Sequence, residues 1–142
     1  EVITVRVALE TLACQLAVKR ITDEEIDQLE DIVNEMIQAS EQGDIDKRIH
    51  LNILFHEKLV ETSGNKLIVQ LYKYMRFGTW PLLTGRLSNM DPIHISTRHR
   101  ILLNALRSRD LEKITAAIRD HIESTSLPLG ELLAKEKNSN HS

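Results

Sequence analysis

The spacing of the apolar residues constrains the fold of this chain more than any other feature. Over most of the 142 positions they recur at steps of three and four residues, which is the period of an amphipathic α-helix. The strict alternation that marks a half-buried strand does not occur between turn signals. Only 5 Gly and 3 Pro residues punctuate the pattern, and they divide it into helices. We therefore predict an all-α fold.

The ends of the predicted helices are marked by capping and breaking residues. Thr22 stands three residues before Glu25, which is the spacing of a capping box, and Asp110 is a second N-cap. Gly43 and Gly64 supply stops. The helices predicted in this way cover about residues 2–19, 22–43, 46–62, 65–78, 92–107 and 110–126, and Pro128 starts a short seventh. Because the connections are short, successive helices should pack as antiparallel neighbours in one bundle.

Each predicted helix has an apolar face for the core. The stripes expected to be buried include Val5, Leu9, Leu12 and Leu16 in the first helix, Ile26, Leu29, Val33, Met36 and Ile37 in the second, and Leu67, Leu71, Tyr74 and Met75 in the fourth. With 42% hydrophobic residues, the chain can fill a single core of this kind.

Three histidines lie on such apolar faces, each in a different predicted helix: His56, His99 and His121. Asn52 stands four residues before His56 and therefore on the same face. Buried imidazoles are costly without partners, so three that converge predict a shared metal or a hydrogen-bonded polar cluster. Spacing alone leaves these two interpretations balanced. The histidines expected in solvent are His50, His94 and His141.

Charge and cysteine content exclude several functions. The net charge of −3 gives no overall attraction to nucleic acid or to an anionic membrane. No apolar run approaches the roughly 18 residues of a membrane span. The single cysteine, Cys14, cannot form an intrachain disulfide, so we expect a reduced, cytoplasmic protein.

Several short motifs, in this order, resemble one known family. They are Arg6-Val-Ala-Leu-Glu10, Thr22-Asp-Glu-Glu25, Asn52-Ile-Leu-Phe-His56, Ser63-Gly-Asn65 with Leu67, and Arg98-His99-Arg100 followed by Leu106 and Asp110. The set resembles the FCD domain, the effector-binding and dimerising C-terminal domain of a subfamily of GntR-type bacterial transcription regulators. The resemblance implies an antiparallel bundle of six or seven helices around a ligand and metal pocket. It extends from about Glu1 to Ser126, and we assign residues 1–137 to the domain and 138–142 to a disordered tail.

The resemblance also implies a set of site residues. In such domains three histidines and a carboxylate hold a divalent metal, and the histidines match His56, His99 and His121. The carboxylate position is occupied here by Asn52, whose carbonyl oxygen can coordinate but carries no charge. We expect a divalent transition metal, Zn or Ni, at this centre. Arg6 and Arg76 are the candidates for contact with a carboxylate ligand.

The function implied is sensing. A small organic acid would bind at the metal, the chain would form a homodimer, and DNA would be bound only through an N-terminal winged helix-turn-helix domain that these 142 residues do not include. Two alternatives remain: a metal-free helical module for ligand binding and dimerisation, or a metal-dependent enzyme. The enzyme lacks a well-placed general base, because the carboxylates cluster on predicted solvent faces.

Overall fold

The computed structural model describes the helices of residues 2–76 and 90–139, with side chains described for 2–75 and 90–125. Within these residues the chain is all-helical. The helices are α1 (Val2–Ala17), α2 (Asp23–Glu41), α3 (Ile45–Glu61), α4 (Lys66–Arg76), α6 (Pro92–Thr97), α7 (His99–Arg107) and α8 (Leu111–Ser139). None of the helices in this part of the chain is long and apolar enough to cross a membrane.

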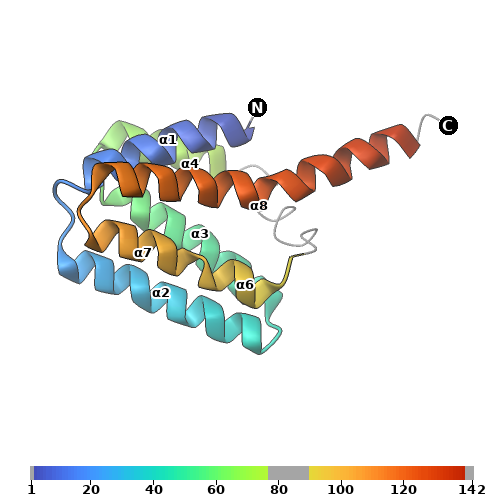
Figure 1. Ribbon diagram of the computed structural model, residues 1–142, viewed down its shortest axis with the longest axis horizontal. Helices are drawn as coiled ribbons and strands as arrows, with labels where there is room; N and C mark the ends of the chain where they lie inside the picture. The colour runs from blue at the N-terminus through green and yellow to red at the C-terminus, as the bar shows by residue number, and fades with distance from the viewer. Residues whose placement is uncertain (1, 77–89, 140–142) are drawn as a thin grey trace.

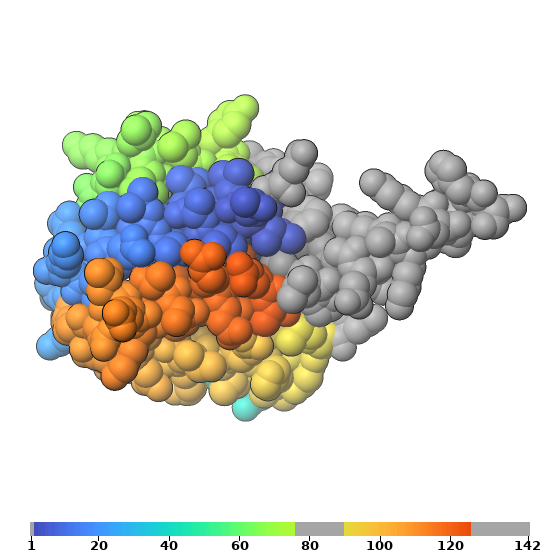
Figure 2. Space-filling view, turned by 45° about the horizontal axis from the view of Figure 1, so that its top comes forward, coloured from blue at the N-terminus to red at the C-terminus, as the bar shows by residue number. Residues whose placement is uncertain are grey.

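The helices run up and down through one bundle, as expected from the short connections (Figure 1). The α1 helix packs against α8, α3 and α4, and α2 packs against α3, α6 and α7. The N-terminal helix therefore lies between α4 and α8 on one face of the molecule (Figure 2).

The predicted caps form. The backbone N–H of Glu25 donates to Thr22 Oγ1 over 3.1 Å, and the Glu25 carboxylate accepts from the Thr22 N–H over 2.9 Å, which completes the capping box. Asp110 Oδ1 accepts the N–H groups of Glu112 and Lys113 at the start of α8. These bonds fix where α2 and α8 begin.

The core contains the stripe predicted for α2 and the apolar faces of α3, α7 and α8. Fully or nearly fully buried members are Ile26, Leu29, Val33 and Met36 of α2, Ile49 and Leu59 of α3, Leu102, Leu103 and Leu106 of α7, and Ile114, Ile118 and Ile122 of α8.

The stripe predicted for α1 is wrong at three of its four positions, and only Leu9 is partly buried. Val5, Leu12 and Leu16 are 48%, 46% and 36% exposed, and the buried face of the helix carries smaller residues instead. The buried residues of α1 are Val7, Glu10, Thr11, Ala13, Cys14 and Ala17. Because small side chains let α1 approach its neighbours closely, the larger apolar residues are left on the outside.

The stripe predicted for α4 is wrong in the same way at three of its four positions, and only Met75 is partly buried. Leu67, Leu71 and Tyr74 are 64%, 47% and 82% exposed, whereas Ile68 and Tyr72 are buried against α1 and α3. Both α1 and α4 have apolar residues on two faces. A prediction from hydrophobicity alone chooses the face with the larger residues, which lies on the outside.

The predicted end of the last long helix is also wrong. No break occurs near Ser126, and α8 continues through Pro128 to Ser139 as one helix that extends beyond the bundle (Figure 1). Proline in a helix removes one backbone hydrogen bond, a cost that a long helix can tolerate. Residues 138 and 139 of the expected tail are thus helical, and residues 140–142, with His141, lie outside the described part of the chain.

Candidate metal centre

The bundle brings together the three histidines that the sequence placed on separate helices. His56 of α3, His99 of α7 and His121 of α8 are 1%, 0% and 5% exposed. One ring nitrogen from each lies within 4.8 Å of those of the other two. The ring centroids of His99 and His121 are 4.4 Å apart, and that of His56 is 5.4 and 5.2 Å from them. These three residues are called the histidine cluster below.

His99 is fixed by the backbone just before it. Its Nδ1 lies 3.2 Å from the carbonyl oxygen of Ile95 and 3.1 Å from that of Ser96, at the end of α6. The last carbonyls of a helix lack partners within the helix, so a ring N–H can satisfy them. Nδ1 therefore carries the proton, and Nε2 presents a lone pair to Asn52 Oδ1, 3.0 Å away. The ring also packs edge-on against Phe55, with centroids 4.8 Å apart.

The cluster is electrically neutral at neutral pH. Burial lowers the pKa of His99 to about 3, with a further contribution from His56. Burial also lowers the pKa of His56 and that of His121, and the positive charge of Arg6 adds to both shifts. Each ring therefore has one proton and one lone pair, which is the form in which imidazole binds metals.

The unsatisfied atoms of the cluster fit a metal ion. His56 Nε2 and His121 Nδ1 are buried and have no hydrogen-bond partner among the residues that the structure describes. A buried polar atom without a partner costs about 1–3 kcal/mol, so two of them in one cluster require an explanation. Neutral nitrogen donors from three residues suit Zn, Ni and other first-row ions and leave room for further ligands.

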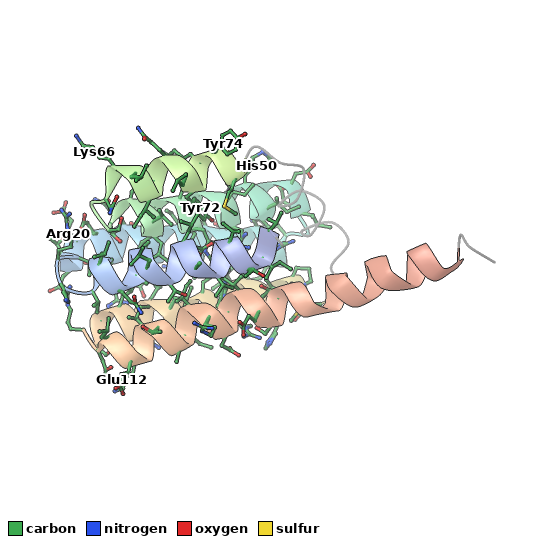
Figure 3. All side chains as sticks on the ribbon, turned by 90° about the horizontal axis from the view of Figure 1, so that it is seen from above. Arg20, His50, Lys66, Tyr72, Tyr74 and Glu112 are labelled. Atoms are coloured by element: carbon green, nitrogen blue, oxygen red, sulfur yellow. The ribbon has the colours of Figure 1, made fainter. Side chains whose placement is uncertain are left out.

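The sequence analysis gave no role to Glu10, a buried carboxylate beside the cluster. Glu10 is 0% exposed, and its Oε2 lies 2.6 Å from His56 Nδ1. Its Oε1 accepts hydrogen bonds from Arg6 Nε over 2.6 Å and from the Tyr72 hydroxyl over 3.0 Å. Figure 3 shows Tyr72 on the side of α4 that faces α1. A signal was present in the sequence, since Glu10 lies at helical spacing from Val7, Cys14 and Ala17 on an otherwise apolar face.

The remaining predicted site residues take different positions. Asn52 is half-buried beside His99, so it lies at the cluster as expected. Arg6 is 21% exposed and is joined to the cluster through Glu10. Arg76 is the last residue of α4, and its side chain lies outside the described residues. His50 and His94 are exposed, which confirms their separation from the cluster.

The fold and the buried cluster define a helical bundle domain with a polar centre. Residues 1–124 match the family model of the FCD domain. The chain belongs to the FCD domain family of GntR-type transcription regulators.

Two curated proteins show the same relationship. The HTH-type transcriptional regulator McbR of Escherichia coli is 28% identical over 116 residues, covering 79% of this chain and 52% of that protein. The putative transcriptional regulatory protein NedR of Micromonospora viridifaciens is 31% identical over 100 residues, covering 70% of this chain and 71% of that protein. The chain thus spans about half the length of McbR.

Two solved structures share the fold. E. coli McbR/YncC superimposes with a TM-score of 0.83 at 22% identity, covering 94% of this chain and 64% of that chain. Streptococcus agalactiae GntR superimposes with a TM-score of 0.72 at 27% identity, covering 87% and 55%. The relatives are named as transcription regulators, which indicates a regulatory role for this domain.

Proposed function

We propose that this domain senses a small organic acid at a divalent transition metal held by His56, His99 and His121, with Asn52 beside them. The observation that carries the proposal is the pair of buried, unpartnered nitrogens, His56 Nε2 and His121 Nδ1, in a cluster of neutral rings. When bound, the metal would act as a Lewis acid that accepts a carboxylate oxygen. Zn and Ni are the ions we expect first.

Arg6 supports an anionic ligand. Its positive charge is felt by all three histidines, and its pKa is raised by the attraction of Glu10, against the effect of burial. Arginine stays charged and can bind a carboxylate with two parallel hydrogen bonds. We therefore assign Arg6 to ligand binding, and we retain Arg76 as the second candidate from the sequence.

Signal transmission would use α1. In a full-length regulator, a DNA-binding domain preceding residue 1 would continue into this helix, and Glu10 lies on it beside His56. A ligand that binds one arrangement of the bundle better than another shifts the population between them.

We expect a cytoplasmic protein, as transcription regulators act on DNA there, and no specific DNA binding by these 142 residues alone.

The homodimer expected from the family resemblance requires an apolar surface. Two exposed stripes are available: Val5, Leu12 and Leu16 on α1, and Leu67, Leu71 and Tyr74 on α4. Tyr74 points away from the α1 side of its helix, opposite to Tyr72 (Figure 3). We propose that a second copy of the chain covers one or both stripes.

The decisive experiment is elemental analysis of untagged protein purified without chelator, comparing the wild type with His99→Ala and His94→Ala. His94 is an exposed histidine on the neighbouring helix α6, so it controls for the loss of any imidazole. We expect near one equivalent of metal in the wild type and in His94→Ala, and almost none in His99→Ala.

A wild type that stays metal-free after incubation with Zn and Ni would contradict the metal and support the alternative of a metal-free ligand-binding module. Neutral Asn52 favours that alternative, because an amide turned to donate from Nδ2 would satisfy His99 Nε2 without an ion. An enzyme would instead turn over a candidate substrate steadily. Glu10, the buried carboxylate beside the cluster, already accepts three hydrogen bonds, which argues against a general base there.

A further inference from the structure

Glu10 joins three helices through one carboxylate. Arg6 donates to it from α1, His56 from α3 and Tyr72 from α4. The Arg6 guanidinium is an ion-pair partner at 2.6 Å and the Tyr72 hydroxyl donates over 3.0 Å, so the contacts that the structure describes for Glu10 favour a charged carboxylate. The carboxylate is therefore an anion held inside the protein.

This anion determines which nitrogen of His56 is protonated. A ring with a single proton can carry it on Nδ1 or on Nε2, and Nδ1 lies 2.6 Å from a carboxylate oxygen, which can only accept. The proton therefore resides on Nδ1, where it is donated to Glu10. The lone pair is then on Nε2, the buried atom that has no partner within the described residues.

Neither of the other two histidines has an equivalent carboxylate among the contacts described for residues 2–75 and 90–125. The Nδ1 proton of His99 goes to backbone carbonyls, and His121 Nδ1 is itself one of the unpartnered atoms. Asn52, the side chain that contacts His99 Nε2, is neutral. Negative charge can thus reach a cation in the cluster only through His56, among the contacts that the structure describes.

We propose that Glu10 is a positioning residue of the histidine cluster: it holds His56 in the Nδ1–H form and supplies, through that hydrogen bond, the negative charge that Asn52 lacks. Carboxylates that accept from the far nitrogen of a ligand histidine raise its basicity and fix its orientation, and their loss typically costs 10- to 100-fold in metal affinity. The effect on affinity rests on the proposed metal site. The effect on the proton of His56 does not.

Three variants separate positioning from packing. Glu10→Leu removes both the hydrogen bond and the charge. Glu10→Gln keeps an oxygen that can accept from His56 Nδ1 but removes the charge. Tyr72→Phe is the matched control, since it removes one donor from Glu10 and leaves the contact with His56 intact.

The first readout is ¹⁵N NMR of histidine-labelled, metal-free protein, in which the two neutral forms of an imidazole give different nitrogen shifts. We expect His56 in the Nδ1–H form in the wild type, Tyr72→Phe and Glu10→Gln, and a mixture or the Nε2–H form in Glu10→Leu. An Nε2–H ring in the wild type, or an unchanged ring in Glu10→Leu, would overturn the proposal. If Glu10→Leu fails to fold, an Nδ1–H ring in the wild type that is kept in Glu10→Gln supports it.

The second readout is the affinity for Zn²⁺ alone, measured by competition with a chromophoric chelator. We expect it to fall about 10-fold in Glu10→Gln and about 10- to 100-fold in Glu10→Leu, with Tyr72→Phe close to the wild type. Equal affinities in Glu10→Gln and Tyr72→Phe would refute the charge role. A wild type that binds no Zn²⁺ would overturn both the metal site and the charge role, while the NMR result would still decide whether Glu10 positions His56.

Discussion

Asn52 Oδ1 lies 3.0 Å from His99 Nε2, and with the amide placed in this way both atoms carry lone pairs. The His99 proton is on the opposite nitrogen, between two backbone carbonyls, so it cannot relieve the contact. A cation between the two atoms would turn a repulsive contact into two favourable ones, and rotation of the amide would do the same without a cation. Position 52 is therefore where the two functional interpretations of this domain diverge.

Replacing Asn52 with Asp should strengthen metal binding. The substitution places a charged ligand at the cluster, so we expect the affinity for Zn²⁺ to rise at least 10-fold in chelator competition. The metal-free variant should be less stable than the wild type, because the new carboxylate faces the lone pair of His99. Asn34→Asp is the matched control, since it adds the same charge at an exposed position of α2. An equal gain in both variants would show that only overall charge matters.

Acid should destabilise the metal-free domain. The folded-state pKa values of all three cluster histidines are lowered, that of His99 to about 3, so below about pH 6.5 the unfolded chain binds more protons than the folded one. Stability then falls with decreasing pH, by up to about 4 kcal/mol per pH unit if three protons are taken up on unfolding. Glu10 adds a loss of the same sign between about pH 4.5 and 2.

Urea unfolding of the metal-free protein at pH 7.5, 6.5, 5.5 and 5.0 measures this slope. The variant His94→Ala, which changes an exposed histidine, should behave as the wild type does. Stability that stays constant from pH 7.5 to 5.0 would mean that the cluster takes up protons in the folded state.

The two turns at Gly43 and Gly64 should respond differently to alanine. Both have positive φ, +71° and +66°, which costs an L-residue about 1–2 kcal/mol. A Cβ at Gly43 meets nothing within 4 Å, whereas one at Gly64 would overlap the guanidinium of Arg20. Gly43→Ala should therefore show the backbone cost alone, and Gly64→Ala should be slightly less stable than Gly43→Ala in urea unfolding, because the flexible end of Arg20 must move aside. Arg20→Ala combined with Gly64→Ala should remove most of that excess, and no reduction would rule out the overlap as its cause.

A charge placed on the exposed apolar stripes should separate the proposed dimer. We expect Leu12→Glu or Leu71→Glu to give a monomer in sedimentation velocity at concentrations where the wild type is a dimer, because a buried unpaired carboxylate is costly at an interface. Ile101→Glu is the control, since Ile101 is 55% exposed on α7, outside both stripes. If the wild type is already a monomer, the proposed homodimer is wrong for this chain.

The sequence predicted those helices whose apolar and buried faces coincide. Helical spacing and caps located α2, α3, α7 and α8, and the three histidines converge because they continue those buried faces. The predicted buried faces of α1 and α4 were wrong. Small residues of α1 and a buried tyrosine of α4 face the core, and larger apolar residues of both helices face outward. The prediction also missed Glu10, since a carboxylate becomes a core residue only when partners from other helices satisfy it, and periodicity contains no information about those partners.

Two of the histidines owe their orientation to different kinds of partner. The oxygens that fix His99 belong to the main chain at positions 95 and 96, so most side-chain exchanges there would leave them in place. The oxygen that fixes His56 belongs to a single replaceable side chain. During evolution, the orientation of His99 is thus maintained as long as the backbone path is kept, whereas the orientation of His56 can change through a single substitution at Glu10. Divergence in what such domains recognise would most easily begin at the first helix.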